Sequence, residues 1–252
     1  MERIDEPTAP FGLLDVQGDG GHIAEARELL PAELSQAIRR RARSLGVSAA
    51  SLVHLAWALV LARTTGRQDV VFGTVLFGRM QGGEHADRVL GMFINTLPVR
   101  VSVDGRGVLA ALKELHGLLA QLLRHEHAPL ALAQRCSAVD AQAPLFTSLL
   151  NYRYSATDSA AAVAADAVDG VDDLGGHERT NYPLTVSVDD LGEGFMLSAQ
   201  VQAPIAAQRV CALVPSRGGS WRRDRGRAPR SALGGLLRRP HRHRAHRGRP
   251  PR

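Results

Sequence analysis

A block of apolar side chains at residues 49–64 constrains the fold of this chain more than any other feature of the sequence. Its large members go nearly all the way round a helix: Leu52, Val53, Leu55, Trp57, Leu59, Val60 and Leu61. A helix that is apolar on every side is stable only when other elements cover it. We therefore predict a helix in the middle of a core, with Ser48 as its N-cap and Gly66 at its end.

Elements on both sides of this helix supply the covering layers. Amphipathic helices are predicted from Pro31 to Gly46 and over 107–124, because each segment carries a single apolar stripe. Apolar, β-branched or alternating runs predict strands at 68–78, 91–103 and 144–155, and a hairpin over 181–202. Pro98 places its strand at a sheet edge or a bend, because it cannot donate to a ladder. The expected fold class is α/β (α+β layered), with a mixed sheet covered by helices.

Composition divides the chain into three segments. Residues 1–30 are rich in Asp, Gly and Pro and predict a loop or linker, and residues 31–211 predict the folded domain. Residues 212–252 predict a disordered Arg/Pro-rich tail, because they offer too little apolar surface to bury. Residues 216–252 hold 13 Arg and one acid, a net charge of +12, whereas the rest of the chain carries −6. The body therefore gives no electrostatic reason to expect a nucleic-acid partner.

The two cysteines, Cys136 and Cys211, exclude a disulfide scaffold and a multi-cysteine zinc site. No apolar run reaches 18 residues, and no basic start with an apolar stretch precedes a cleavage site. We therefore expect a cytoplasmic protein with no membrane partner.

Four stretches follow one another along the chain: DVVFGTVLFGR (69–79), GMFINTLPVR (91–100), HEHAPLALAQ (125–134) and PLFTSLLNYR (144–153). In this order they resemble motifs of the condensation domains of nonribosomal peptide synthetases. The second is similar to the family's G-x-F-[VI]-N-T-x-x-x-R motif, and the third resembles its His-x-x-x-Pro motif. The resemblance runs from about residue 5 to about residue 210.

The resemblance implies a chloramphenicol acetyltransferase-like fold of two lobes around a cleft, of which this chain matches the C-terminal lobe alone. The family joins a thioester on one carrier protein to an amine on another. The implied partners are peptidyl or acyl carrier proteins and neighbouring synthetase modules, and the phosphopantetheine arms are substrates rather than a directly bound cofactor. The family's catalytic His-His-x-x-x-Asp-Gly motif belongs to the first lobe, and no two of the ten histidines here are adjacent. We expect a partial condensation domain with no catalytic residue, inactive alone.

Two asparagines and two arginines are the candidate channel-lining side chains: Asn95, Asn151, Arg79 and Arg100. Asn95 either lines the cleft or satisfies buried backbone groups, and Asn151 is the preferred channel-lining residue of the later strand. The two arginines end strands. They either hold a pantetheine phosphate in a forked geometry or form ion pairs with Asp87 or Glu84.

The histidines near the end of the long helix have a catalytic and a structural interpretation. His125 and His127 flank Glu126, and a histidine beside a carboxylate can act as an oriented base. We favour a structural role, in which His125 caps or packs against the helix C-terminus. His116, His125 and His127 match no zinc spacing, so no metal site is predicted.

Two alternatives remain. The chain could be a non-catalytic interaction module that docks carrier proteins or pairs with a separately encoded first lobe. The tail could be a basic arm that binds nucleic acid or anionic lipid. For the tail we favour a frameshifted origin over a binding arm, because Arg, Pro, Gly, His and Ala are the residues that GC-rich codons give in a wrong frame.

Overall fold

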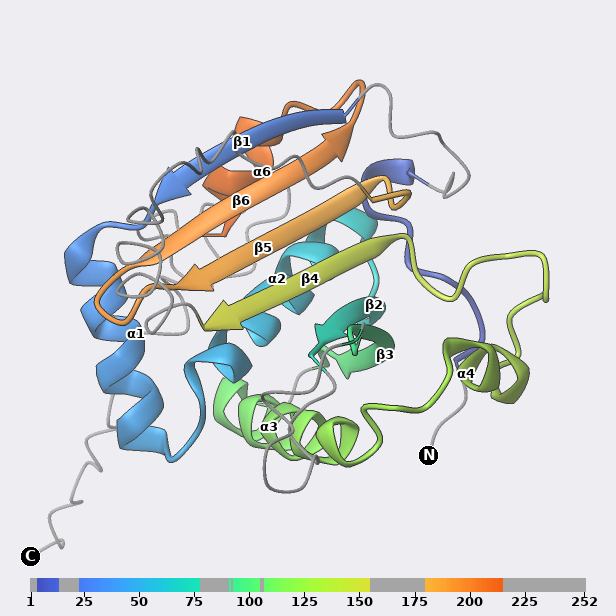
Figure 1. The fold of residues 1–252 in the computed structure, drawn as a ribbon, viewed down its shortest axis with the longest axis horizontal. Coiled ribbons are helices and arrows are strands. Elements are labelled where there is room, and N and C mark those ends of the chain that lie inside the picture. The colour runs from blue at the N-terminus through green and yellow to red at the C-terminus, as the bar shows by residue number, and fades with distance from the viewer. Residues whose placement is uncertain are drawn as a thin grey trace, which may run out of the picture.

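The computed structural model describes residues 4–13, 23–77, 91, 93–104, 107–154 and 180–214 (Figure 1). Its elements follow one another in the order η1 (Pro10–Gly12), β1 (Ile23–Leu29), α1 (Ala32–Leu45), α2 (Ala49–Thr65), β2 (Asp69–Leu76), β3 (Asn95–Ser102), α3 (Val108–Arg124), α4 (Leu130–Cys136), β4 (Ser148–Tyr154), β5 (Leu184–Asp190), β6 (Phe195–Gln202) and α6 (Ala207–Leu213). The tail from residue 215 onward and the candidate Arg79 lie outside the described residues.

The strands form one mixed six-stranded sheet in the order β1-β6-β5-β4-β2-β3. The neighbours β2, β4 and β5 run parallel, and the other pairs are antiparallel. Alternate residues of the strands pack with α1, α2, α3 and α6 into one large core. In Figure 1, α2 lies behind β4 and β5. The predicted helix-covered mixed sheet is thus confirmed.

Local signals fix the central helices as predicted. The Ser48 side chain accepts a hydrogen bond from the Ser51 N–H and caps α2, which ends at Gly66 with φ 71°. Gly46, with φ 66°, closes α1 through its backbone N–H. Helix α2 is buried from Ser51 to Ala62, so the prediction of a central core helix is confirmed. Pro98 lies in the edge strand β3, also as predicted.

The prediction that residues 1–30 form a loop or linker is wrong for one described segment. Residues 23–29 form the edge strand β1, which pairs with β6 along its whole length. This strand is exposed on both faces over most of its length, so it has no apolar period to reveal it. Thr8, fully buried, accepts a hydrogen bond from the Val71 N–H and receives one from the Thr147 hydroxyl on its carbonyl. The segment around Thr8 is therefore part of the packed domain.

A smaller apolar cluster covers part of the other sheet face. It consists of Val71, Val139, Leu145, Phe146 and Leu149, against which α4 packs. Gly73 is required here for its lack of a side chain, because a Cβ would collide with the Phe146 ring and lie 2.5 Å from Leu149. Among the described residues, the rest of this face, over β1, β6, β5 and the far half of β4, carries mostly polar side chains.

In the part of the chain that the structure describes, no single helix is long and apolar enough to cross a membrane. Helices α1 and α2 satisfy that test of length and composition only as a pair, and a bend of 108° separates them.

Candidate functional site

The open face of the sheet carries a polar hollow of about 310 Å³. Its lining comes from five strands and the segment before β5: Glu25, Arg27, Val75, Leu149, Asn151, Arg153, Thr180, Thr185, Ser187, Asp189, Met196, Ser198 and Gln200. The pleat explains this composition, because the residues between these positions point into the apolar core. The hollow is therefore built mostly by the polar residues that alternate with the core positions, together with Val75, Leu149 and Met196.

Asn151 lies within the hollow, opposite Ser187 in the parallel pairing of β4 and β5. Its side-chain oxygen is buried and accepts no hydrogen bond from any described residue. A buried acceptor without a donor costs free energy unless a bound group satisfies it. Asn151 thus carries an unused hydrogen-bond acceptor beside the hollow.

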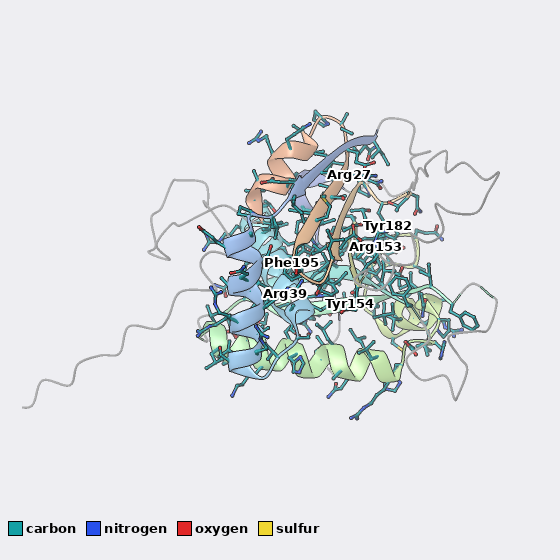
Figure 2. All side chains as sticks on the ribbon, turned by 60° about the vertical axis from the view of Figure 1, so that its left-hand side comes forward. Arg27, Arg39, Arg153, Tyr154, Tyr182 and Phe195 are labelled. Carbon is teal, nitrogen blue, oxygen red and sulfur yellow. The ribbon has the colours of Figure 1, made fainter. Side chains whose placement is uncertain are left out.

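The charged groups of the hollow are neutralised in pairs. Arg153 of β4 donates from Nε and one terminal nitrogen to both carboxylate oxygens of Asp189, at 2.5 and 3.1 Å, across the strand pair. Arg27 forms an ion pair with Glu25 along β1. Figure 2 labels Arg27 on β1 and Arg153 on β4, with β6 and β5 between them in the sheet. The lining of the hollow, which we call the wall, therefore offers hydrogen bonds without a net charge.

Asn95 is used for backbone contacts, one of its two predicted roles. Its side-chain nitrogen donates to the carbonyls of Glu126 and Ala128, both at 2.8 Å, and its oxygen accepts from the Thr96 N–H. These bonds fix the segment after α3 against the start of β3. Asn95 does not line the hollow on the open face.

Arg100 forms an ion pair, but with a partner that differs from both predicted ones. Its Nε and a terminal nitrogen lie 2.8 and 2.7 Å from Asp69 Oδ2, on the adjacent strand β2. The predicted partners Asp87 and Glu84 lie outside the described residues, as does Arg79. The antiparallel register of β2 and β3 explains the choice of partner, because it brings Asp69 diagonally opposite Arg100.

The histidines singled out from the sequence lie apart from the hollow. His125 occupies the C-cap position of α3, where its N–H bonds to the Leu122 carbonyl. His116 Nδ1 lies 2.9 Å from Ser51 Oγ and joins α3 to α2. His127 Nε2 lies 3.8 Å from the buried Glu126 carboxylate. Among the described residues, no three His, Cys, Asp or Glu side chains are grouped to hold a metal ion.

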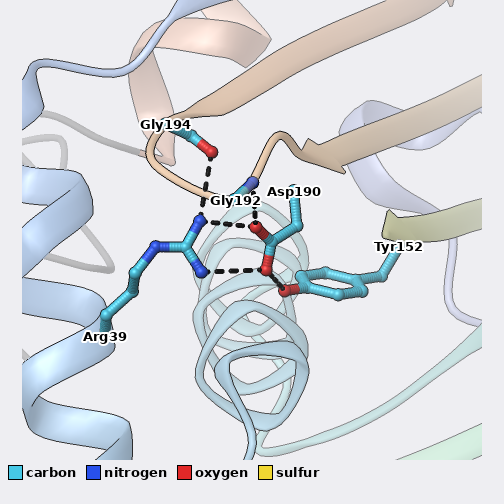
Figure 3. Close-up of polar contacts among 5 residues, drawn as sticks. All are labelled: Arg39, Tyr152, Asp190, Gly192 and Gly194. Carbon is cyan, nitrogen blue, oxygen red and sulfur yellow. Dashed lines mark hydrogen bonds and ion pairs between the residues drawn. The ribbon is translucent and has the colours of Figure 1, made fainter. Parts of the chain in front are cut away.

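A network that the sequence reasoning missed joins α1 to the β5–β6 turn (Figure 3). Arg39 donates to both oxygens of Asp190 and to the Gly194 carbonyl, and the Tyr152 hydroxyl donates to Asp190 at 2.6 Å. Burial raises the pKa of Asp190, but hydrogen bonds from Arg39, Tyr152 and the Gly192 N–H outweigh it and lower that pKa below its ordinary value. Burial and the same carboxylate raise the pKa of Tyr152.

The position of Asp190 in the strand was the available signal for this network. Asp190 follows Leu184, Val186 and Val188 at every second residue, so it lies on the apolar side of β5. A carboxylate at such a position requires a buried cation or donor. The guanidinium of Arg39 also lies 4.4 Å above the Phe195 ring centre.

His54 is a second residue that the sequence reasoning passed over. It lies on α2, where Nδ1 is 2.7 Å from the Ala50 carbonyl and Nε2 is 2.8 Å from the Thr74 hydroxyl. Burial lowers its pKa to about 4, so the ring is neutral in the folded protein at pH 7. Both nitrogens are occupied by the fold, and His54 does not line the hollow.

Residues 22–203 match the family described as Condensation domain. Malpibaldin synthetase of Mortierella alpina is 52% identical over 211 residues, which cover 84% of this chain and 4% of that protein. Chondramide synthase cmdD of Chondromyces crocatus is 33% identical over 160 residues, 63% of this chain and 4% of that protein. This chain thus spans only a small part of the synthetases that it matches.

Solved structures show the same fold at low sequence identity. The condensation domain of Monacolin K polyketide synthase MokA superposes with a TM-score of 0.59 at 19% identity, over 81% of this chain and 45% of that one. The first condensation domain of the CDA synthetase gives 0.58 at 22% identity, over 81% and 44%. The sheet and its helices therefore have the architecture of condensation domains, which confirms the fold that the four motifs implied. Together with the family match over most of its length, this identifies the chain as a member of the condensation domain family of nonribosomal peptide synthetases.

Proposed function

We propose that this chain supplies one wall of a condensation site and has no condensing activity alone. The observation that carries the proposal is the open polar hollow, whose lining among the described residues contains Asn151 but no histidine or cysteine. The wall can orient a substrate through hydrogen bonds. It has no group of its own suited to take a proton from an attacking amine at neutral pH, because its two carboxylates are already in ion pairs.

The reaction of the family shows what is missing. An amine nitrogen attacks the thioester carbonyl, a C–N bond forms, the C–S bond breaks, and the proton lost by the amine ends on the departing thiol. Alignment of the two reactants can contribute about 7–11 kcal/mol, and a positioned base about 10²–10⁴-fold in rate. A single open wall holds one reactant at most. Both contributions then depend on a second wall that brings a base.

The proposed substrates are the phosphopantetheine arms of two carrier proteins, one acylated and one carrying the amine. Such an arm is extended, with secondary amides whose N–H groups suit the unsatisfied oxygen of Asn151. The neutral, paired charges of the wall suit the uncharged amide portion of such an arm better than its anionic phosphate. The free thiols of Cys136 and Cys211 suit the reducing cytoplasm that we propose as its location.

An amide-formation assay tests the proposal. Two purified carrier proteins are loaded, one with an N-acetylated aminoacyl thioester and one with a free aminoacyl thioester, and product is followed by mass spectrometry. We expect the chain alone to give no product above the uncatalysed rate. Turnover well above that rate, lost in Asn151→Ala but kept in the exposed control Gln36→Ala, would show that the chain is competent alone and overturn the proposal.

A second function, pairing with a separately encoded first lobe, is favoured by the one-sidedness of the hollow. The matched condensation domain structures place more than half of their own chain outside the region shared with this one. We infer that such a half would roof the hollow and restore activity. Adding the preceding half of a relative's condensation domain to the same assay tests this function.

A further inference from the structure

We propose that Ser187 and Ser198 set the width and the direction of the path that a substrate takes through the hollow. The inference rests on the proposed function and adds the residues that decide which ligand the wall admits. Asn151 of β4 pairs with Ser187 of β5. Ser187 pairs in turn with Ser198 of β6, and Ser198 with Arg27 of β1. These four hollow-lining residues, which we call the serine row, therefore cross four neighbouring strands at one level (Figure 1).

Larger side chains flank the serine row on both sides. The strand registers place two further levels of hollow-lining residues beside it, one made of Leu149, Thr185, Gln200 and Glu25 and the other of Arg153, Asp189 and Met196. Side chains on one face of a sheet stand roughly perpendicular to it, so a longer side chain rises further from the backbone. Ser187 and Ser198, both half-buried, thus form the floor of a trough that runs across the strands between two higher banks.

The dimensions of this trough define the shape of its ligand. Three spacings of about 4.8 Å between neighbouring strands make the serine row roughly 14 Å long. The hollow holds about 310 Å³, near the lower end of the range of about 300–1,000 Å³ that is typical of small-molecule sites. A narrow chain, extended across the strands, fits these limits, and the amide portion of a phosphopantetheine arm has this form. Serine hydroxyls can donate to its carbonyls or accept from its N–H groups, and Asn151 adds its unused acceptor at one end.

The strand pair that carries half of the trough is fixed from both faces of the sheet. On the open face, Arg153 bonds to Asp189 with two donors. On the core face, the Tyr152 hydroxyl and Arg39 donate to Asp190. A slip of one residue would exchange the two faces of β5 and break both sets of bonds. The serine row is therefore held in place before a ligand arrives, which lowers the entropic cost of binding.

A titration with matched variants tests this path. The probe is S-acetylpantetheine, and Kd is measured by NMR titration of the full chain, with the side-chain amide of Asn151 as the reporter. Ser187→Leu and Ser198→Leu fill the trough, whereas Ser198→Ala leaves it open. Ser102→Leu places the same larger side chain on β3, at the other end of the sheet. We expect Kd to rise at least about tenfold for the two trough-filling variants and to change less than about threefold for the other two.

The outcomes separate the inference from the function on which it rests. Circular dichroism melts first establish which variants fold, and either trough-filling variant suffices to test the width. Wild-type binding that these variants leave intact overturns the inference and leaves the proposed substrate standing. A loss in Ser198→Ala equal to that in Ser198→Leu also overturns it, because the hydroxyl and not the width would then decide. A loss in Ser187→Leu alone places the ligand along β5 and overturns the crosswise path. Absence of wild-type binding overturns the proposed substrate, and the inference with it.

Discussion

Acid should destabilise the domain through His54 before it affects the carboxylates. In the folded protein the pKa of His54 is lowered to about 4, chiefly by burial, whereas an unfolded histidine titrates near 6.5. The unfolded chain therefore binds this proton more tightly. The stability that the neutral ring provides is fully present above pH 6.5, declines as the pH falls from 6.5 to 4, and does not decline further below 4. At about 1.4 kcal/mol per pH unit, the loss across this window is on the order of 3 kcal/mol.

Urea unfolding at several pH values measures this loss. The fluorescence of Trp57, 1% exposed in the same helix, reports on the core around His54. Wild type should lose about 3 kcal/mol between pH 6.5 and 4. His54→Gln should be less stable at pH 7 but nearly flat over that window, because the amide does not titrate. His125→Gln, at the exposed end of α3, should keep the wild-type slope.

Equal slopes for wild type and His54→Gln would refute the reasoning. Asp190 does not confuse the measurement. Hydrogen bonds from Arg39 and Tyr152, against the opposing effect of burial, keep its pKa below the ordinary carboxyl value. Its contribution to stability is therefore present at pH 4 and above, and is lost at more acidic pH.

Two further predictions concern packing and the Arg39 network. Gly73→Ala should cost about 1–3 kcal/mol of unfolding free energy, because its Cβ would collide with Phe146 and Leu149. The control Gly117→Ala on α3, with open space around its Cβ, should be neutral or stabilising by about 0.5–1 kcal/mol. Equal effects of the two substitutions in urea titrations would contradict this prediction. Arg39→Met should cost about 3 kcal/mol by leaving the Asp190 carboxylate buried without its cation. Adding Asp190→Asn should recover part of the loss, and a strictly additive double mutant would disprove the coupling.

Elements whose pattern lies within a single helix, strand pair or capping residue were predictable from the sequence. Helix α2 is apolar on every face and is buried on every face. The N-cap of α2 at Ser48 and the left-handed C-cap of α1 at Gly46 depend on neighbours within four residues. They can therefore be found without the tertiary structure. The β5–β6 hairpin shows the same, because its alternation is local.

Features that depend on a distant partner were not predictable in the same way. Strand β1 carries charged residues at the exposed edge of the sheet and is held there by backbone hydrogen bonds to β6. Such bonds leave no periodic pattern in the sequence. The register of β2 and β3 brings Asp69 to Arg100. The role of Thr8 depends on Val71, which lies some sixty residues further along the chain. Such contacts follow from topology, which the local pattern does not contain.

The polar wall lies between these two cases. Alternation in β5 and β6 predicts that Thr185, Ser187, Ser198 and Gln200 share the face opposite the core, but not what they face. The parallel β4–β5 pairing adds Asn151 and turns Arg153 toward Asp189, which removes the net charge of the wall. A sheet whose open face is polar and internally neutral is stable in water without a second wall. A wall built in this way can therefore fold before any partner covers it, as the proposed function requires.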